Sequence, residues 1–198
     1  MPSNQPKLIL ASGSPRRQEL MRELGFTFDV QPQDLDETPL KGEKPRTYVC
    51  RIAREKAISA AKKNAGNIVL AADTSVALGR RIFGKPENAD GAADMLRQMS
   101  GRRHRVMTAV VVVDAEGKVH EDMTSTTVKL RPLQEKDIKN YVANPKNWQG
   151  LAGSYAVQSA AGGSLAKAVN GSISGIVGLP LVETLNLLKR CGFDNAQA

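Results

Sequence analysis

The chain has few cysteines, few aromatic residues and no long apolar run, and each shortage excludes a class of protein. Among its 198 residues, Cys50 and Cys191 are too few for a disulfide framework and match no metal-ligand spacing. No apolar stretch approaches the roughly 18 residues of a membrane helix. Residues 1–7 are polar and lack the apolar core of an export signal. We therefore expect a cytoplasmic protein that does not associate with membranes.

The shortage of aromatic residues also limits what the positive charge can serve. There are 28 Lys and Arg against 20 Asp and Glu, which gives a net charge of +8. Such an excess suits nucleic acid, a membrane surface or small phosphorylated ligands. Proteins that bind single strands place aromatic stacking surfaces beside their cations, whereas the aromatic residues here are 4% of the chain and scattered. The scattered aromatic residues thus disfavour single-stranded nucleic acid, and a solvated surface stays the simplest interpretation of any single run of charge.

Hydrophobic patterning predicts an α/β fold whose sheet is mixed, because helices and strands alternate irregularly. Two buried strands are expected at Leu8–Ala11 and Ile68–Ala72, the second ending at Asp73. A hairpin is expected around residues 79–81, and an antiparallel pair at residues 105–114 and 124–130. Phe26, Phe28 and Val30 alternate as in a strand. Helices are expected at residues 16–24, 46–64, 89–99, 134–143 and 181–191, whereas residues 144–178 are rich in Gly, Ser and Ala.

The first group of chemical interest follows the first predicted strand. Ser12 and Gly13 lead to Ser14 and Pro15, which suit the N-cap and first position of a helix, so Arg16 and Arg17 fall in its first turn. Cations there oppose the helix dipole. A bound anion would reverse that cost, because free N–H groups, small hydroxyls and two guanidinium groups would all face it. The alternative is an ordinary helix start with two solvated arginines.

A second group combines a lysine with acids. Lys56 falls on the apolar face of its predicted helix, so it must reach water, pair with Glu37 or Asp36, or meet a phosphate. Asp73 follows a buried strand, where ligand sites of α/β folds gather, although it could simply begin a turn. Lys85 lies between a glycine and a proline in a loop. Cations and carboxylates together suit a metal–polyphosphate site, whereas P-loop and GxGxxG patterns are absent.

The histidines are less informative. His104 follows Ser100 and Gly101 and could make a polar contact, although a single loop histidine is usually structural. His120 and the two cysteines belong to no pattern. These residues predict no site.

Eight short motifs follow one another along residues 8–190. They are Leu10-Ala-Ser-Gly-Ser-Pro-Arg-Arg, Asp36-Glu-Thr-Pro, Ala53-Arg-Glu-Lys-Ala, Ala72-Asp-Thr, Gly84-Lys-Pro, Ser100-Gly with His104-Arg-Val and Thr108, Ala152-Gly-Ser-Tyr with Gln158, and Val177-Gly-Leu-Pro-Leu. In this order they resemble the motifs of the Maf-like nucleoside triphosphate pyrophosphatases. The resemblance implies an elongated mixed sheet flanked by helices, similar to the inosine triphosphate pyrophosphatases, with two lobes around a cleft. It implies one domain at residues 8–193 between tails at residues 1–7 and 194–198.

The resemblance also implies a reaction and its residues. A nucleoside triphosphate would be hydrolysed to the monophosphate and pyrophosphate with Mg²⁺ or Mn²⁺, often by a homodimer. Asp73 matches the family's catalytic acid and, with Glu37, would hold the metal. Positions that bind phosphate or set substrate preference are Ser12, Arg16, Arg17, Lys56, Thr74, Lys85 and Gln158.

The sequence Tyr155-Ala-Val-Gln158 is similar to the branch that prefers dTTP and UTP rather than 7-methyl-GTP. The Gln158 amide could pair with the edge of a pyrimidine through one donor and one acceptor. The chain departs from the family at Leu151, where a lysine is common, and at Ser159, where a glycine is common. Two other functions stay open: a broader pyrophosphatase for modified or several nucleotides, and a non-enzymatic regulator of septum formation.

Overall fold

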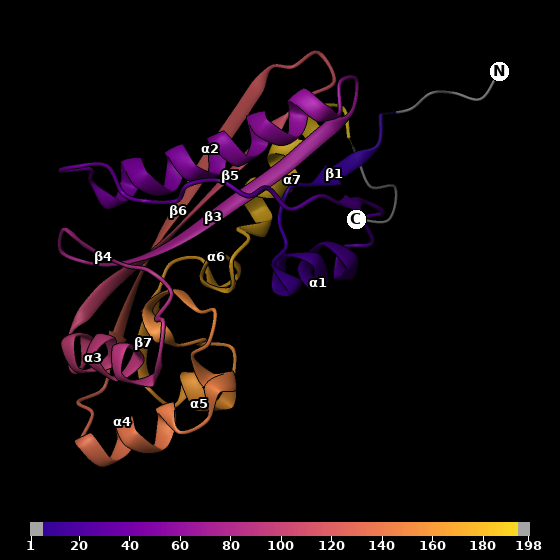
Figure 1. Cartoon of the computed structure of the whole chain (residues 1–198). Helices are drawn as coiled ribbons and strands as arrows, with labels where there is room; N and C mark the ends of the chain where they lie inside the picture. Colours follow the sequence, from indigo (N-terminus) through magenta and orange to yellow (C-terminus); the bar gives the residue numbers. More distant parts are fainter. Residues whose placement is uncertain (1–5, 194–198) are drawn as a thin grey trace. The chain divides into compact units, whose positions relative to one another are not determined.

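The computed structural model describes residues 6–193 and contains a mixed sheet in the strand order β2-β1-β3-β5-β6-β7, with β4 paired to β3 (Figure 1). β1 pairs in parallel with β2 and β3, whereas β3 with β4 and β6 with β7 are antiparallel. This confirms the predicted mixed α/β class. The strands are β1 (Leu8–Leu10), β2 (Asp29–Val30), β3 (Ile68–Leu78), β4 (Arg81–Phe83), β5 (Arg103–Val113), β6 (Val119–Leu130) and β7 (Ala166–Asn170).

Every helix of eight or more residues begins and ends close to its predicted positions. They are α1 (Pro15–Glu23), α2 (Pro45–Lys63), α3 (Ala89–Met99), α4 (Glu135–Val142), α5 (Ala160–Gly163), α6 (Ile173–Val177) and α7 (Leu181–Arg190), with short 3₁₀ turns at Pro145–Asn147 and Ala152–Ser154. Pro15 and Pro45 occupy the first helical turn, where a missing N–H costs nothing. None of these helices is long and apolar enough to cross a membrane.

Among the described residues the chain forms two compact units. The first unit comprises residues 6–73, 108–123 and 178–193, and the second comprises residues 74–107 and 124–177. Strands β3, β5 and β6 each contribute residues to both units. The expectation of a single two-lobed domain stays a prediction. Of the expected tails, residues 1–5 and 194–198 lie outside the described residues, and the backbone N–H of Lys7 donates to Asn67.

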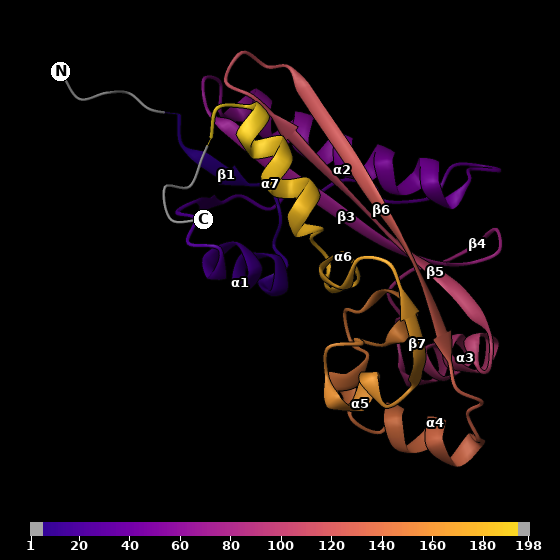
Figure 2. The ribbon, with the colours of Figure 1, turned by 180° about the vertical axis from the view of Figure 1, so that it is seen from behind.

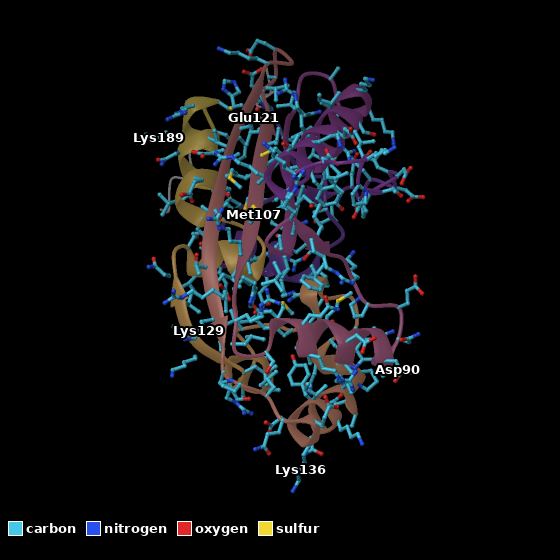
Figure 3. The ribbon with its side chains drawn as sticks, turned by 90° about the vertical axis from the view of Figure 1, so that its left-hand side faces the viewer. Asp90, Met107, Glu121, Lys129, Lys136 and Lys189 are labelled. Atoms are coloured by element: carbon cyan, nitrogen blue, oxygen red, sulfur yellow. The ribbon has the colours of Figure 1, made fainter. Side chains whose placement is uncertain are left out.

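In the first unit, the alternation of strand side chains separates two faces of the sheet. Leu8, Leu10, Ile68 and Leu70 pack with residues of α1 and α7, including Met21 and Leu187, in one buried cluster. The intervening β3 positions, Val69, Ala71 and Asp73, therefore face the other way. Helix α2 covers that face: Figures 1 and 2 show α2 and α7 on opposite sides of the strands, and Figure 3 shows the same arrangement with Lys189 on α7 labelled.

The second unit has its own core around α3 and α4. Leu96, Met99, Ile138, Tyr141 and Trp148 pack there with residues of β3 to β6 in one buried cluster.

Close packing also fixes the turn at residues 152–154. Gly153 has φ +70°, and a Cβ at this position would lie 2.9 Å from Val76 Cγ1. Only glycine combines this backbone conformation with this contact.

Three sequence expectations differ from the structure. Strand β3 does not end before Asp73 but continues to Leu78, because Val76 and Ala77 pair with β4. The strand expected from Phe26 to Val30 is reduced to Asp29–Val30; the N–H of Phe26 bonds to Met21 O, so its side chain enters the core from a turn. β7 lies in the Gly-, Ser- and Ala-rich segment, where the residue types gave no strand pattern.

Candidate functional site

The loop between β1 and α1 holds a buried arginine. Arg17 is only 9% exposed; its Nε donates to Gly178 O at 2.8 Å, and its Nη1 donates to Ser12 Oγ at 2.9 Å. The same hydroxyl oxygen accepts a longer bond from the N–H of Ser14 at 3.3 Å. Burial lowers the pKa of Arg17 from 12.5, and the negative charge of Asp73 opposes that shift. Arg17 is therefore a fixed, desolvated cation and not the solvated arginine of the simpler interpretation.

Lys56 joins two carboxylates. Its Nζ lies 2.9 Å from Asp73 Oδ1 and 2.6 Å from Glu37 Oε1. Lys56 and Asp73 are 9% and 7% exposed, whereas the Glu37 side chain is 42% exposed. Of the partners that the sequence left open for Lys56, Glu37 is present, and Asp36 instead accepts a bond from the N–H of Thr38. The strong contact is the buried pair with Asp73.

Strand alternation explains why Asp73 meets Lys56. Asp73 follows Val69 and Ala71 on the face covered by α2, where Lys56 lies on the buried stripe with Ile52 and Ala60. Asp73 was expected at the end of a strand and instead lies within β3, because the polar residues after it continue the ladder. Burial raises the pKa of Asp73 above 3.8, and the positive charges of Lys56 and Arg17 oppose that increase.

A cluster of polar contacts that the sequence did not predict holds the loop carrying Glu37. The Tyr48 hydroxyl donates to Glu37 O at 2.9 Å, and Arg51 Nη2 donates to Thr38 O at 3.2 Å. Arg51 also binds both oxygens of Glu43, at 2.8 and 2.9 Å, which lowers the pKa of Glu43 to about 2. An arginine eight residues after a glutamate is a common pattern, so it gave no usable signal. The bonds to the carbonyls of Glu37 and Thr38 hold the backbone that directly follows the Glu37 side chain.

The remaining cation of the first unit that was predicted for the site is Arg16. It is half-buried at the start of α1, and burial lowers its pKa from 12.5. The first turn of α1 contains no acidic residue, and Ser14 does not cap it through its side chain. Two arginines and uncapped N–H groups therefore meet at one helix start, which suits an anion.

Three predicted site residues belong to the second unit. Thr74 follows Asp73 directly in β3 and is half-buried. Lys85 is exposed, in a loop held by the bond from the N–H of Gly153 to Gly84 O. Gln158 is exposed between the 3₁₀ turn at Ala152–Ser154 and α5. The structure thus brings together Ser12, Arg16, Arg17, Glu37, Lys56 and Asp73 within the first unit, whereas Lys85 and Gln158 lie in the second.

His104 is structural in its surroundings. It lies within β5 and not in the expected loop, is 2% exposed, and its Nε2 lies 2.6 Å from the Tyr155 hydroxyl. Burial lowers the pKa of His104 to about 4, so the ring is neutral at pH 7. The pair fixes Tyr155, three residues before Gln158. Tyr155 is thus the partner in the polar contact that was expected for His104.

The chemistry of the site can be stated from its first-unit residues. Buried cations lie beside two carboxylates whose oxygens converge on one nitrogen. Oxygen donors of this kind are those that Mg²⁺ and Mn²⁺ take, usually one or two carboxylates together with substrate phosphates. The donor set therefore fits the metal that the family resemblance implies.

A model of the Maf-like protein family matches residues 7–191. The chain belongs to the Maf-like protein family. This confirms the resemblance seen in the sequence motifs.

Curated Maf relatives match over nearly their whole length. A dTTP/UTP pyrophosphatase of Roseobacter denitrificans is 49% identical over 189 residues, which are 95% of this chain and 98% of the relative. One of Ruegeria sp. is 48% identical over 186 residues, with 93% and 94% covered. Among solved structures, the Ham1 protein of Staphylococcus aureus is 14% identical, with a TM-score of 0.46 over 63% of this chain and 71% of that chain. A nucleoside-triphosphatase of Mycobacterium abscessus has 20% identity and a TM-score of 0.41, over 64% and 75%.

Proposed function

We propose that this Maf-family protein hydrolyses dTTP and UTP to the monophosphate and pyrophosphate, by attack of water on the α-phosphorus. The observation that carries the proposal is the pair of carboxylates, Asp73 and Glu37, held on Lys56 Nζ beside the buried Arg17. The activity printed for the full-length relatives gives the substrate class.

Asp73 is the proposed catalytic acid–base residue. A general base works best when its pKa approaches the working pH, and burial raises the pKa of Asp73 in that direction. When phosphate oxygens draw Lys56 away from Asp73, the carboxylate loses its main neutralising partner. The carboxylate oxygens released by Lys56 would then be available to hold the metal ion and to orient the reactive water. The ion pair thus keeps Asp73 ionised until substrate is bound.

One of the proposed phosphate ligands, Arg17, is fixed before substrate arrives. Arg17 cannot move without breaking its bonds to Ser12 and Gly178, so little reorganisation accompanies binding. Arg16, Lys56 and Lys85 would contribute further charge to the leaving pyrophosphate. Together these four cations carry a charge of +4, which is half of the net charge of +8.

Glu37 and Asp73 would hold a divalent metal ion. Such an ion supplies charge for the phosphate oxygens and lowers the pKa of a bound water. Glu37 suits this role because its side chain is part-exposed, while Tyr48 and Arg51 hold its backbone segment. The remaining positions concern the base: Arg16, Thr74 and Gln158 would set the preference, with the Gln158 amide facing a pyrimidine edge. A cytoplasmic location and a homodimer stay predictions of the family resemblance.

The test is pyrophosphate release from a panel of dTTP, UTP, CTP, GTP and 7-methyl-GTP with Mg²⁺ or Mn²⁺. Asp73→Asn should lower turnover of dTTP and UTP by about 10²- to 10⁴-fold, the usual contribution of a general base. The matched control is Asp34→Asn, since Asp34 is an exposed acid. Near-normal turnover by a folded Asp73→Asn protein would contradict the role. No release from any nucleotide by the native protein would contradict the enzymatic function itself.

A further inference from the structure

Three side chains outside the proposed active site converge from distant parts of the chain. Asp114 directly follows β5, His120 lies near the start of β6, and Cys191 directly follows α7. One ligand atom from each, a carboxylate oxygen, an imidazole nitrogen and the thiol sulfur, all lie within 4.8 Å of one another. Figure 2 shows the end of α7 beside the turn that joins β5 and β6. No motif in the sequence indicates this group, because His120 and Cys191 are 71 positions apart in the chain.

The backbone holds each of these ligands in place. The N–H of Lys118 donates to Asp114 Oδ1 at 2.8 Å, while Asp114 Oδ2 lies 2.8 Å from His120 Nε2. The N–H of Gly117 donates to Asp114 O, which closes the turn. The N–H of Cys191 donates to Leu187 O and Leu188 O, which fixes the backbone of Cys191 at the helix end. Outer-shell bonds of this kind are what orient ligands in metal sites.

The charge around the thiol is mixed, because the carboxylates of Asp114 and Glu116 act on Cys191 with negative charge and Lys118 acts with positive charge. Both side chains are mostly buried but still reach solvent, since 11% of the Asp114 side chain and 18% of the His120 side chain is exposed. A cavity of about 310 Å³, lined by Asp114 and by the end of α2, lies beside the turn.

From this convergence we propose that Asp114, His120 and Cys191 form a second metal site, selective for Zn²⁺-class ions. One carboxylate, one imidazole and one thiolate are a donor set for Zn²⁺ or Co²⁺, with water in the fourth position, whereas Mg²⁺ takes oxygen ligands alone. Bond lengths of about 2.0–2.3 Å to zinc place ligand atoms roughly 3–4 Å apart, within the spread observed here. Binding replaces the Asp114–His120 hydrogen bond and displaces the thiol proton to solvent. The ion would join the β5–β6 turn to the end of α7, a structural role separate from hydrolysis.

The test is titration of chelator-treated protein with Co²⁺, followed by absorption spectroscopy. A bound thiolate gives a sulfur-to-cobalt charge-transfer band, and in this chain only Cys50 or Cys191 can supply one. The band should saturate at one equivalent, disappear in Cys191→Ser and persist in the matched control Cys50→Ser. Co²⁺ at the carboxylates of the proposed active site contributes no such band, so the two sites are distinguished. Absence of the band from the native protein, or its retention in Cys191→Ser, overturns the proposal.

A second measurement needs no variant. Zn²⁺ should slow alkylation of Cys191 in the native protein and leave alkylation of Cys50 unchanged, as read by mass spectrometry of each modified peptide. It should also raise the thermal midpoint of the native protein, because an ion that binds only the folded state stabilises it. Equal alkylation rates for Cys191 with and without Zn²⁺ would contradict the site even if the variants failed to fold.

Discussion

Replacing Lys56 with methionine should lower the free energy of unfolding, because it leaves the buried carboxylate of Asp73 without its cationic partner. Methionine keeps most of the volume of the lysine stem and removes only the ammonium group. Asp73, whose side chain is 10% exposed, then loses the partner 2.9 Å away. Breaking a buried ion pair by removing one member costs about 3–5 kcal/mol. The part-exposed contact with Glu37 adds at most about 1 kcal/mol, so the expected loss comes mainly from Asp73.

The loss should depend on pH in a defined direction. Burial already raises the pKa of Asp73 above its unfolded value of 3.8, and removing Lys56 raises it further. A carboxyl group with a raised folded-state pKa contributes stability below its unfolded pKa and loses it as pH rises through the folded value. The free-energy cost of Lys56→Met should therefore be largest at pH 8 and decrease toward pH 4, as Asp73 takes up a proton.

The assay is urea unfolding at pH 8 and at pH 4–5, in a double-mutant cycle with Asp73→Asn. In the Asp73→Asn background the Lys56→Met change should cost about 2–3 kcal/mol less than in the native background. Lys62→Met on the same helix is the matched control, because Lys62 is exposed and its replacement should change stability by less than about 0.5 kcal/mol. Equal costs in both backgrounds, or a cost that does not change with pH, would refute the reasoning.

Three further predictions concern the elements around the site. Burial lowers the pKa of His104 to about 4, so stability should fall by about 2–3 kcal/mol as pH decreases from 7 to 4, and urea unfolding of His104→Gln should show a smaller decrease. Arg51→Met should raise KM for the metal–nucleotide complex by freeing the Glu37 loop, whereas steady-state kinetics of Arg54→Met, which removes an exposed ion pair, should match the native protein. Gly153→Ala should lower the unfolding free energy by about 1–3 kcal/mol in urea, because its Cβ would overlap Val76; an unchanged midpoint would contradict this.

The long helices could be read from the sequence because local chemistry specifies them. Pro15 and Pro45 mark helix starts, and α3 matches its predicted range, Ala89–Met99, with Asn88 as a side-chain N-cap. Short elements such as β7 were missed. Their stability comes from pairing with a distant strand, which a window of sequence does not contain.

The functional site, like the fold, could be predicted from the sequence only in part. The apolar stripe of α2 was sufficient to place Lys56 inward and to name Glu37 as a partner, but the contact with Asp73 was not predicted. That contact depends on β3 continuing through Asp73, which its pairing with β4 decides. The contacts of Tyr48 with Glu37, and the convergence of His120 with Cys191, join segments that only the folded chain brings together.

The central claim is that water attacks the α-phosphorus of dTTP or UTP at Asp73. Its most direct test is hydrolysis in water enriched in the heavy oxygen isotope, with mass spectrometry of both products. The heavy oxygen should appear in the nucleoside monophosphate and not in the pyrophosphate, and the Asp73→Asn protein should form both products far more slowly. Label in the pyrophosphate, or unchanged rates in the Asp73→Asn protein, would contradict the account.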